Sequence, residues 1–372
     1  MIYLDYSATT PPKREVIDVF SKVSQEYFAN SNSLHKLGLK SKELEDYATK
    51  NIAKYLNIKP KEIIYTSSAS EANNLALKGI CFKYKNRANH IITTKLEHSS
   101  IIETCNYLEK LGFIIDYVDL NKDGTVNLED LENKLTNDTL LVSISCVDSE
   151  LGIRQPVEEI GKIIKKYPKC YFHVDCTQAI GKVKVDFTNI DLASISAHKF
   201  YGLKGIGILI KKENIELEPL IHGGKSTTIY RSGTPALGLI VSLKKALELI
   251  IDKIDENYEK VKSLNELIIN KLKTYPNVHI NSTDKSIKHT INISIINIKP
   301  ETFIHALEEY DIYVSTKSAC SKIDSISRPI KALTQDDKLA SSSIRISLSY
   351  QTTKEEIIKF LEIFENVIKN LI

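Results

Sequence analysis

Strand-like and helical patterns alternate through the first two thirds of this 372-residue chain. Amphipathic segments such as Glu71–Lys85 and Val157–Tyr167 separate short apolar runs that are typical of buried strands. The predicted strands are Ile63–Thr66, His90–Thr94, Ile114–Asp119, Leu140–Val147, Tyr171–Asp175, Leu192–Ser196 and Ile206–Ile210. Strands that alternate with helices in this way predict an α/β fold, in which a mostly parallel sheet is covered by helices on both faces.

The pattern changes after Pro235, where apolar residues at helical spacing predict one or two long helices. Strands are predicted at Asn292–Ile296 and Ser343–Leu348, and the motif Thr353-x-x-Glu356 is a capping box for a last helix. The length suggests about two domains. We therefore expect a large α/β domain over residues 12–259 and a smaller α+β domain made of residues 1–11 and 260–372.

The composition is that of an ordinary globular protein, and its charges are nearly balanced. The chain has 50 Lys and Arg against 47 Asp and Glu, a net charge of +3, which favours neither a nucleic-acid nor a membrane partner. No stretch is long and apolar enough to span a bilayer, and the N-terminus lacks the pattern of a signal peptide. None of the six cysteines forms a C-x-x-C pair. These features predict a cytoplasmic protein in a reduced compartment.

Cys320 differs from the other five cysteines, which lie in apolar or helical runs and are expected to be buried. It occupies the small, polar segment Lys317-Ser318-Ala319-Cys320-Ser321-Lys322. Nearby lysines favour its thiolate form, so Cys320 is a candidate nucleophile.

Lys199 follows a predicted buried strand and precedes a glycine-containing turn. Open α/β sheets bind ligands at such strand ends. A lysine that loses solvation there is easier to deprotonate, as a lysine that forms a Schiff base requires. Asp175 ends the strand upstream, where a carboxylate suits the pyridinium nitrogen of pyridoxal 5′-phosphate (PLP). Together the two residues indicate a PLP site.

Two further features have both a structural and a functional interpretation. Ser68-x-x-Glu71 is a capping box at a helix start, and the free backbone N–H groups there could bind a phosphate. Arg345 lies in an alternating strand of a chain with only six arginines. Its partner is either a substrate carboxylate or an internal acid. His98 follows a strand and could stack on a flat cofactor.

An acidic turn imitates a calcium-binding loop, because Asp119, Asn121 and Asp123 alternate before Gly124. A strand precedes it where a helix is required, and the final glutamate is replaced by Asp130. We therefore expect a strand–turn–helix link and no metal site.

Considered together, these segments resemble the cysteine desulfurases, PLP enzymes of aminotransferase class V and fold type I. The similarity is strongest to the branch that serves iron–sulfur-cluster assembly, nitrogenase assembly and tRNA thiolation, and it runs almost from end to end. The motifs that carry it are Tyr3-Leu4-Asp5-Tyr6-Ser7-Ala8-Thr9-Thr10-Pro11, Glu71-Ala72-Asn73-Asn74-Leu75-Ala76, Glu97-His98, His173-Val174-Asp175-Cys176-Thr177-Gln178, Ser196-Ala197-His198-Lys199, Arg231-Ser232-Gly233-Thr234, Ser318-Ala319-Cys320 and Ser342-Ser343-Ile344-Arg345.

The resemblance implies a PLP site in a homodimer. Lys199 would form the internal aldimine and later move protons, and Asp175 would pair with the pyridine nitrogen. Gln178 would bond the ring hydroxyl, and His98 would stack on the ring and assist proton transfer. The implied cofactor-binding set is Ala69, Ser70, His98, Asp175, Gln178, Ser196, His198, Lys199 and, from the second subunit, Thr234.

The resemblance also implies how the substrate reacts. Asn30 and Arg345 would grip the carboxylate of L-cysteine, and Cys320 would attack the sulfur of the cysteine–PLP ketimine. Lys199, Cys320 and His98 are thus the expected catalytic residues. The products would be L-alanine and a persulfide on Cys320, which passes its sulfur to an acceptor protein that docks nearby.

Several positions depart from the family pattern at the expected mouth of the site. The usual Asn-Asn-Glu after the fourth strand is Asp148-Ser149-Glu150, which removes an asparagine that contacts cofactor and substrate. Lys225 stands inside the usual glycine-rich run, and Lys317 replaces a glycine before the reactive cysteine. Three alternatives therefore stay open: another class V enzyme such as a selenocysteine lyase or transaminase, a non-catalytic PLP-binding scaffold, and, more distantly, a nicotinamide enzyme.

Overall fold

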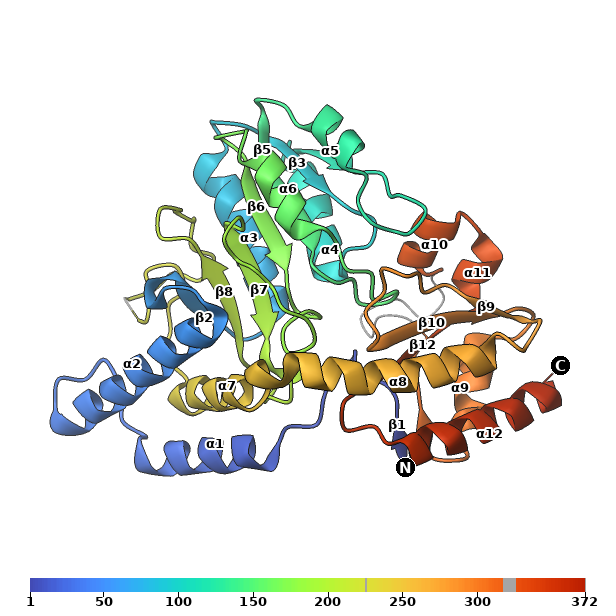
Figure 1. Ribbon diagram of the computed structural model, residues 1–372. Helices are drawn as coiled ribbons and strands as arrows, with labels where there is room; N and C mark the ends of the chain where they lie inside the picture. Colours follow the sequence, from blue (N-terminus) through green and yellow to red (C-terminus); the bar gives the residue numbers. More distant parts are fainter. Residues whose placement is uncertain (225, 317–325, 372) are drawn as a thin grey trace.

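The computed structural model describes residues 1–224, 226–316 and 326–371. Its centre is a seven-stranded sheet with the order β2-β8-β7-β6-β5-β3-β4 (Figure 1). β8 is antiparallel to both of its neighbours, and all other adjacent pairs are parallel. The predicted mostly parallel sheet is confirmed. Its strands are β2 (Ile63–Thr66), β3 (His90–Thr93), β4 (Ile114–Tyr117), β5 (Thr139–Ser145), β6 (Tyr171–Asp175), β7 (Leu192–Ser196) and β8 (Gly207–Lys211).

Helices cover both faces of this sheet because successive strand residues point to opposite sides. Ile91 packs into a core with Leu75 and Ile101, whereas its neighbour Ile92 belongs to the core on the other face. The helices around the sheet are α1 (Arg14–Glu26), α2 (Lys36–Leu56), α3 (Ala69–Tyr84), α4 (Ser99–Glu109), α5 (Leu128–Lys134), α6 (Val157–Ile164) and α7 (Leu237–Ile250), with short 3₁₀ turns at Pro60–Glu62, Ala197–Lys199 and Ile251–Lys253.

A smaller α+β unit is built around an antiparallel sheet with the order β12-β10-β9 and a parallel pair, β1 with β11. Its apolar core combines Ile2 and Leu4 with residues from Val261 to Ile368. We therefore retain the division into 12–259 and 1–11 with 260–372 as a proposal. The elements are β1 (Ile2–Tyr3), α8 (Ile254–Leu272), β9 (Val278–Ile280), β10 (Thr290–Ile295), α9 (Pro300–Glu308), β11 (Ile312–Tyr313), α10 (Arg328–Thr334), α11 (Asp337–Ser341), β12 (Ser343–Ser347) and α12 (Lys354–Leu371).

Local signals read from the sequence correspond to the observed turns and caps. The backbone N–H of Thr353 donates to Glu356, whose own N–H donates to Thr353 Oγ1, so the capping box before α12 is present. The acidic turn joins β4 to α5 as predicted, and Asp130 accepts bonds from Asp119 N and Lys134 Nζ. In the three ranges described, no helix has both the length and the apolar character needed to cross a membrane.

The sheet brings several chain segments to one edge. β3, β5, β6 and β7 run parallel, and β2 shares their direction because the antiparallel β8 lies between it and β7. The carboxyl ends of all five strands therefore meet at the same edge, which is where such sheets bind ligands.

Candidate active site

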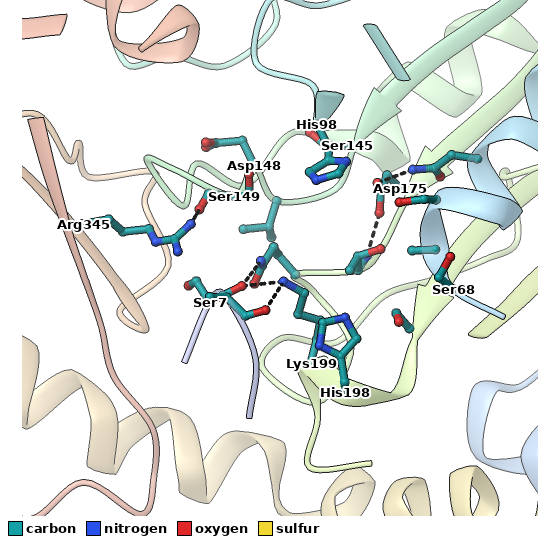
Figure 2. Close-up of a pocket in the computed structure, with 18 residues that line it drawn as sticks. Ser7, Ser68, His98, Ser145, Asp148, Ser149, Asp175, His198, Lys199 and Arg345 are labelled. Carbon is teal, nitrogen blue, oxygen red and sulfur yellow. Dashed lines mark hydrogen bonds between the residues drawn. The ribbon is translucent and has the colours of Figure 1, made fainter. Parts of the chain in front are cut away.

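A cavity of about 180 Å³ opens at this edge (Figure 2). It is lined by strand ends of the large sheet, the start of α3, the N-terminal segment and one residue of β12. The lining residues are Ser7, Ala8, Ser68, Ala69, Ser70, Asn73, His98, Ser145, Val147, Asp148, Ser149, Asp175, Thr177, Gln178, Ser196, His198, Lys199 and Arg345. Nine of the twelve residues predicted for the site are among them: Ala69, Ser70, His98, Asp175, Gln178, Ser196, His198, Lys199 and Arg345.

Lys199 ends the short 3₁₀ turn that follows β7, as the sequence predicted. Its Nζ donates to the carbonyl oxygens of Ser7 at 2.6 Å and Ala8 at 2.8 Å. Two fixed carbonyls thus hold the amine inside the cavity, close to the floor formed by the N-terminal segment (Figure 2). Ser7 and Ala8 were not predicted as contacts, because they act through backbone oxygens.

Asp175 is the last residue of β6 and is 5% exposed. Its Oδ1 accepts from the backbone N–H of Thr177 at 2.9 Å, and its Oδ2 accepts from Asn73 Nδ2 at 2.8 Å. The same Asn73 amide also donates to Ser100 Oγ. A carboxylate fixed on both oxygens keeps one orientation, so Asn73 is a positioning residue, a role that was not predicted from the sequence. Its signal was an asparagine on the buried face of a mostly apolar helix.

His98 caps the N-terminus of α4, and its Nδ1 accepts from the backbone N–H of Ser100 at 3.1 Å. Nδ1 therefore carries no proton, and the neutral ring keeps its proton on Nε2. Burial lowers the pKa of His98, and Asp175 opposes that shift only in part. Near neutral pH the ring is uncharged, which suits stacking on a flat partner with Nε2–H as a donor.

Glu97, directly before His98, is fully buried, and burial raises its pKa to about 8 despite bonds donated by Ser145 and Thr94. Its Oε1 accepts from Thr94 Oγ1 at 2.8 Å and Ser145 N at 3.0 Å, which ties the turn after β3 to the end of β5. Glu97 was recognised only as part of a family motif. Its burial, which the structure reveals, explains why it stays protonated at neutral pH.

One end of the cavity has the character of an anion site. Ser68 caps α3 by accepting from Glu71 N at 3.2 Å, so the N–H groups of Ala69 and Ser70 occupy the first helical turn, where no intrahelical acceptor exists. The capping box is only half formed, because Glu71 accepts from Ser67 N and pairs with Arg231 instead of returning to Ser68.

His198 and Ser196 line the same cavity from the end of β7. Burial and, to a smaller extent, the charge of Lys199 lower the pKa of His198 to about 4, so the ring is neutral near pH 7. Its Nδ1 lies 3.0 Å from Thr9 Oγ1. The other ring nitrogen, Nε2, has no hydrogen-bond partner in the described ranges and can bond to an anion.

Arg345 lies at the opposite end, on β12, and is 1% exposed. It pairs with Asp5 Oδ1 at 2.9 Å and donates to the carbonyl oxygen of Ser149 at 2.7 Å. Both partners position the guanidinium, and Nε has no hydrogen-bond partner within the described ranges. The internal ion pair is therefore real, and the residue also lines the cavity, so its substrate role stays a prediction.

The turn that carries Ser149 is held by Asp148. The Asp148 carboxylate accepts from the backbone N–H groups of Glu150, Leu151 and Ile153 at 2.7–2.9 Å. Burial raises the pKa of Asp148 to about 6, although those bonds oppose the shift. Asp148 stands where the family has an asparagine. Its carboxylate holds the turn together by accepting three backbone hydrogen bonds.

Two predicted residues, Asn30 and Thr234, do not line this cavity. Asn30 is exposed, and its Oδ1 accepts from Asn32 N in a local turn. Thr234 is exposed and borders a separate hollow beside Ser67. Cys320 lies outside the described residues. The roles assigned to all three stay predictions.

Comparison with known proteins agrees with this geometry. A model of the class V aminotransferase family matches residues 2–360. The cysteine desulfurase IscS of Dictyoglomus turgidum is 38% identical over 375 residues, which cover 100% of this chain and 95% of the relative. A solved NifS-like protein has a TM-score of 0.94 at 34% identity and 99% coverage of both chains. A structure described as SspA in complex with cysteine has a TM-score of 0.83 at 32% identity, covering 95% of this chain and 100% of that one.

The chain therefore belongs to the class V aminotransferases, with the fold of PLP fold type I. Within that class it is a member of the cysteine desulfurases, the group that includes the IscS and NifS proteins. The family and the fold class expected from the sequence are both confirmed.

Proposed function

We propose that this chain is a PLP-dependent cysteine desulfurase that converts L-cysteine to L-alanine and passes the sulfur to an acceptor protein. The observation that carries the proposal is the convergence of Lys199, Asp175 and the start of α3 on one cavity in a member of this family. A selenocysteine lyase, another class V lyase or transaminase, or a non-catalytic scaffold is not favoured. The structure offers no reason to prefer them.

The residues present fit PLP. The start of α3 with Ser70, Ser196 and His198 offers donors for the phosphate at one end of the cavity. Asp175, a buried carboxylate with both oxygens positioned, suits a protonated ring nitrogen. Lys199 supplies the amine for the covalent link. When bound, PLP withdraws electrons from the substrate α-carbon. This weakens the bond between the adjacent β-carbon and its sulfur.

The chain's own residues then orient cysteine and move its protons. The Arg345 guanidinium, fixed by Asp5 and the Ser149 carbonyl, binds the substrate carboxylate. Lys199 Nζ would move the proton at the α-carbon, and the neutral His98 ring would be available for stacking, with Nε2–H as a donor.

The sulfur transfer requires no external oxidant. The thiolate of Cys320 forms a bond to the substrate sulfur as the bond between that sulfur and the β-carbon breaks. The electron pair of the broken bond stays with carbon, which takes up a proton, and alanine is released. The two sulfur atoms together lose two electrons, the β-carbon gains two, and a persulfide remains on Cys320.

We further propose a homodimer in the cytoplasm. Thr234 lies on an exposed segment outside its own cavity, which suits a contact with the phosphate in the partner's site. Phe28 and Leu34 are 75% and 91% exposed, as expected for apolar side chains that a second subunit covers. The five cysteines within the described ranges are free and buried, which suits a reducing compartment. The acceptor protein would dock near Cys320.

The test is a spectrum of the purified protein followed by turnover. We expect an absorbance band at roughly 390–420 nm, where protein-bound PLP absorbs, and equal amounts of sulfide and alanine from L-cysteine in the presence of a reductant. Cys320→Ala should keep the band and lose sulfide production, whereas Ser321→Ala, one residue away, should keep both. A Cys320→Ala variant with undiminished turnover of free cysteine would instead favour a lyase. Absence of the band after PLP addition would contradict the cofactor assignment.

A further inference from the structure

A buried lysine lies behind the cofactor site and takes no part in the chemistry described so far. Lys182, in the segment between β6 and β7, is 7% exposed. Its Nζ donates to Gln178 Oε1 at 2.5 Å. Within the ranges that the structure describes, no carboxylate pairs with it, and the groups that act on its charge are the cations Lys199 and Arg345. A buried amine without a counter-ion is costly to maintain, so its retention calls for an explanation.

Lys182 is the first member of a hydrogen-bonded chain that ends at the catalytic lysine. Gln178 accepts from Lys182 through Oε1 and donates through Nε2 to the carbonyl oxygen of Ser7 at 2.9 Å. Lys199 Nζ donates to that same oxygen at 2.6 Å (Figure 2). The Ser7 carbonyl oxygen therefore accepts hydrogen bonds from both Gln178 and Lys199. A movement of the Gln178 amide shifts this oxygen and so changes the position of Lys199 Nζ.

The chain fixes which end of the Gln178 amide faces the cavity. If the amide turned over, its NH₂ group would oppose the Lys182 amine and its oxygen would oppose the Ser7 oxygen, and both bonds would be lost. In the observed orientation one N–H of Nε2 donates to Ser7, and the second has no partner among the described residues, so it can donate into the cavity that Gln178 lines.

We propose that Lys182 is a positioning residue of this site, which holds the Gln178 amide as a donor toward the cofactor's ring oxygen and places positive charge behind Lys199. The inference rests on the proposed function, because the ring oxygen belongs to PLP. Lys182 is the only residue hydrogen-bonded to Gln178 Oε1 in the described part of the chain.

The electrostatic surroundings support this role. Burial, together with the positive charges of Lys199 and Arg345, lowers the pKa of Lys182 to about 7. The other titratable groups that sense its charge are His198 and His289, both of which have lowered pKa values chiefly because they are buried. The protonation of Lys182 is therefore balanced near neutrality, and an anionic cofactor in the cavity would draw a proton onto it.

The experiment compares Lys182→Met with Lys184→Met. Lys184 lies two residues away with its side chain 71% exposed, so the second variant makes the same chemical change without touching the site. For Lys182→Met we expect the dissociation constant of PLP from the apoprotein to rise about tenfold, as loss of an oriented donor predicts. We also expect the pH midpoint of the cofactor band to move up by about one unit, because a nearby positive charge is gone. Lys184→Met should match the wild type in both.

A readout on the apoprotein needs no cofactor. Because an unfolded lysine keeps its proton to higher pH than the buried one, unfolding takes up a proton between about pH 7 and 10.5, and stability rises through that window. Lys182→Met should lack this part of the rise, and Lys184→Met should retain it. Urea unfolding at pH 7 and pH 9.5 measures the difference.

The outcomes separate the two proposals. If the wild type shows the band and Lys182→Met equals Lys184→Met in PLP affinity and band midpoint, the role of Lys182 is refuted and the desulfurase proposal stands. If the wild type forms no band with PLP, both proposals are refuted. If Lys182→Met does not fold, Lys182→Gln replaces it, since glutamine is neutral and keeps a donor. For Lys182→Gln an unmoved band midpoint would refute the electrostatic role.

Discussion

The two ends of the cavity are built in different ways. At the cofactor end, Asp175 and Ser196 are the last residues of adjacent parallel strands, so the register of one sheet sets their positions. At the substrate mouth, Ser149 comes from a loop and Arg345 from the small sheet. The first end is positioned mainly by the large sheet, and the N-terminal segment adds the Ser7 and Ala8 carbonyls that hold Lys199. The second exists only when separate parts of the chain have packed together.

Long-range contacts maintain the mouth. Arg345 pairs with Asp5, 340 residues away in sequence, and Ser327 donates to Glu150 Oε2 at 2.6 Å. A small apolar cluster also packs Ile330 of α10 against residues beside the His98 and Ser149 turns. A feature held by such contacts can change between relatives without disturbing the sheet. The departures from the family pattern are concentrated at the mouth, which agrees with this difference.

The largest effect is expected at the cofactor end. Lys199→Ala removes the amine that makes the covalent link and moves protons, so turnover should fall at least about a thousandfold and the cofactor band should disappear or change. Lys204→Ala, an exposed lysine of the same loop, is the matched control and should leave both unchanged. Turnover of the Lys199→Ala variant near the wild-type rate would show that the cofactor end is assigned wrongly.

A change at the mouth should affect substrate binding and spare the cofactor. Arg345→Lys keeps the charge but loses the planar pair of donors, so KM for L-cysteine should rise about a hundredfold while the cofactor band stays. Asp5→Asn tests the support alone and should raise KM less, since the guanidinium remains. Loss of the band in Arg345→Lys would mean that the two ends are not independent.

A substitution at Glu97 tests whether a buried, protonated carboxyl group stabilises the cofactor end of the cavity. Folded Glu97 keeps its proton up to about pH 8, whereas an unfolded glutamate releases it near 4.5. Folding therefore takes up a proton in that window, and this contribution to stability decreases as the pH rises from 4.5 to 8. Glu97→Gln should remove that slope and gain about 4 kcal/mol over the wild type at pH 9 relative to pH 5. Urea unfolding measures it, with the exposed Glu103→Gln on α4 as control.

Much of the large domain could be predicted from the sequence because most of its strands, all but the edge strand β4, are buried on both faces. Such strands appear as short apolar runs, and all seven were found with ends within two residues of the observed ones. The antiparallel direction of β8 was not predicted. Its apolar run Gly207–Lys211 looks the same in either direction, and the reversal depends on the short turn that follows Lys199.

The site was predictable where a residue's place on a strand end defines its role. Lys199 and Asp175 were found in this way. Asn73 and Lys182 were not, since an amide within a helix and a lysine in a loop become informative only when their burial and partners are known. Ser7 acts through its backbone oxygen, which no side-chain pattern reveals.

The smallest effect is expected for Ser149, where this chain departs from its family. Its carbonyl oxygen, not its side chain, accepts from Arg345, so Ser149→Asn leaves that bond in place. The added amide reaches into the cavity that Ser149 lines and supplies the contact usual in the family, so KM for L-cysteine should fall about threefold, as one exposed hydrogen bond predicts. Ser149→Ala, which only removes a hydroxyl, should leave KM within about twofold of the wild type.

Steady-state kinetics, with the cofactor band as a measure of bound PLP, decide whether the substrate mouth keeps the family geometry. A lower KM for Ser149→Asn alone means that the turn held by Asp148 still presents the family geometry. A raised KM means that the mouth has been rebuilt around serine and accepts a different substrate or a partner-bound one.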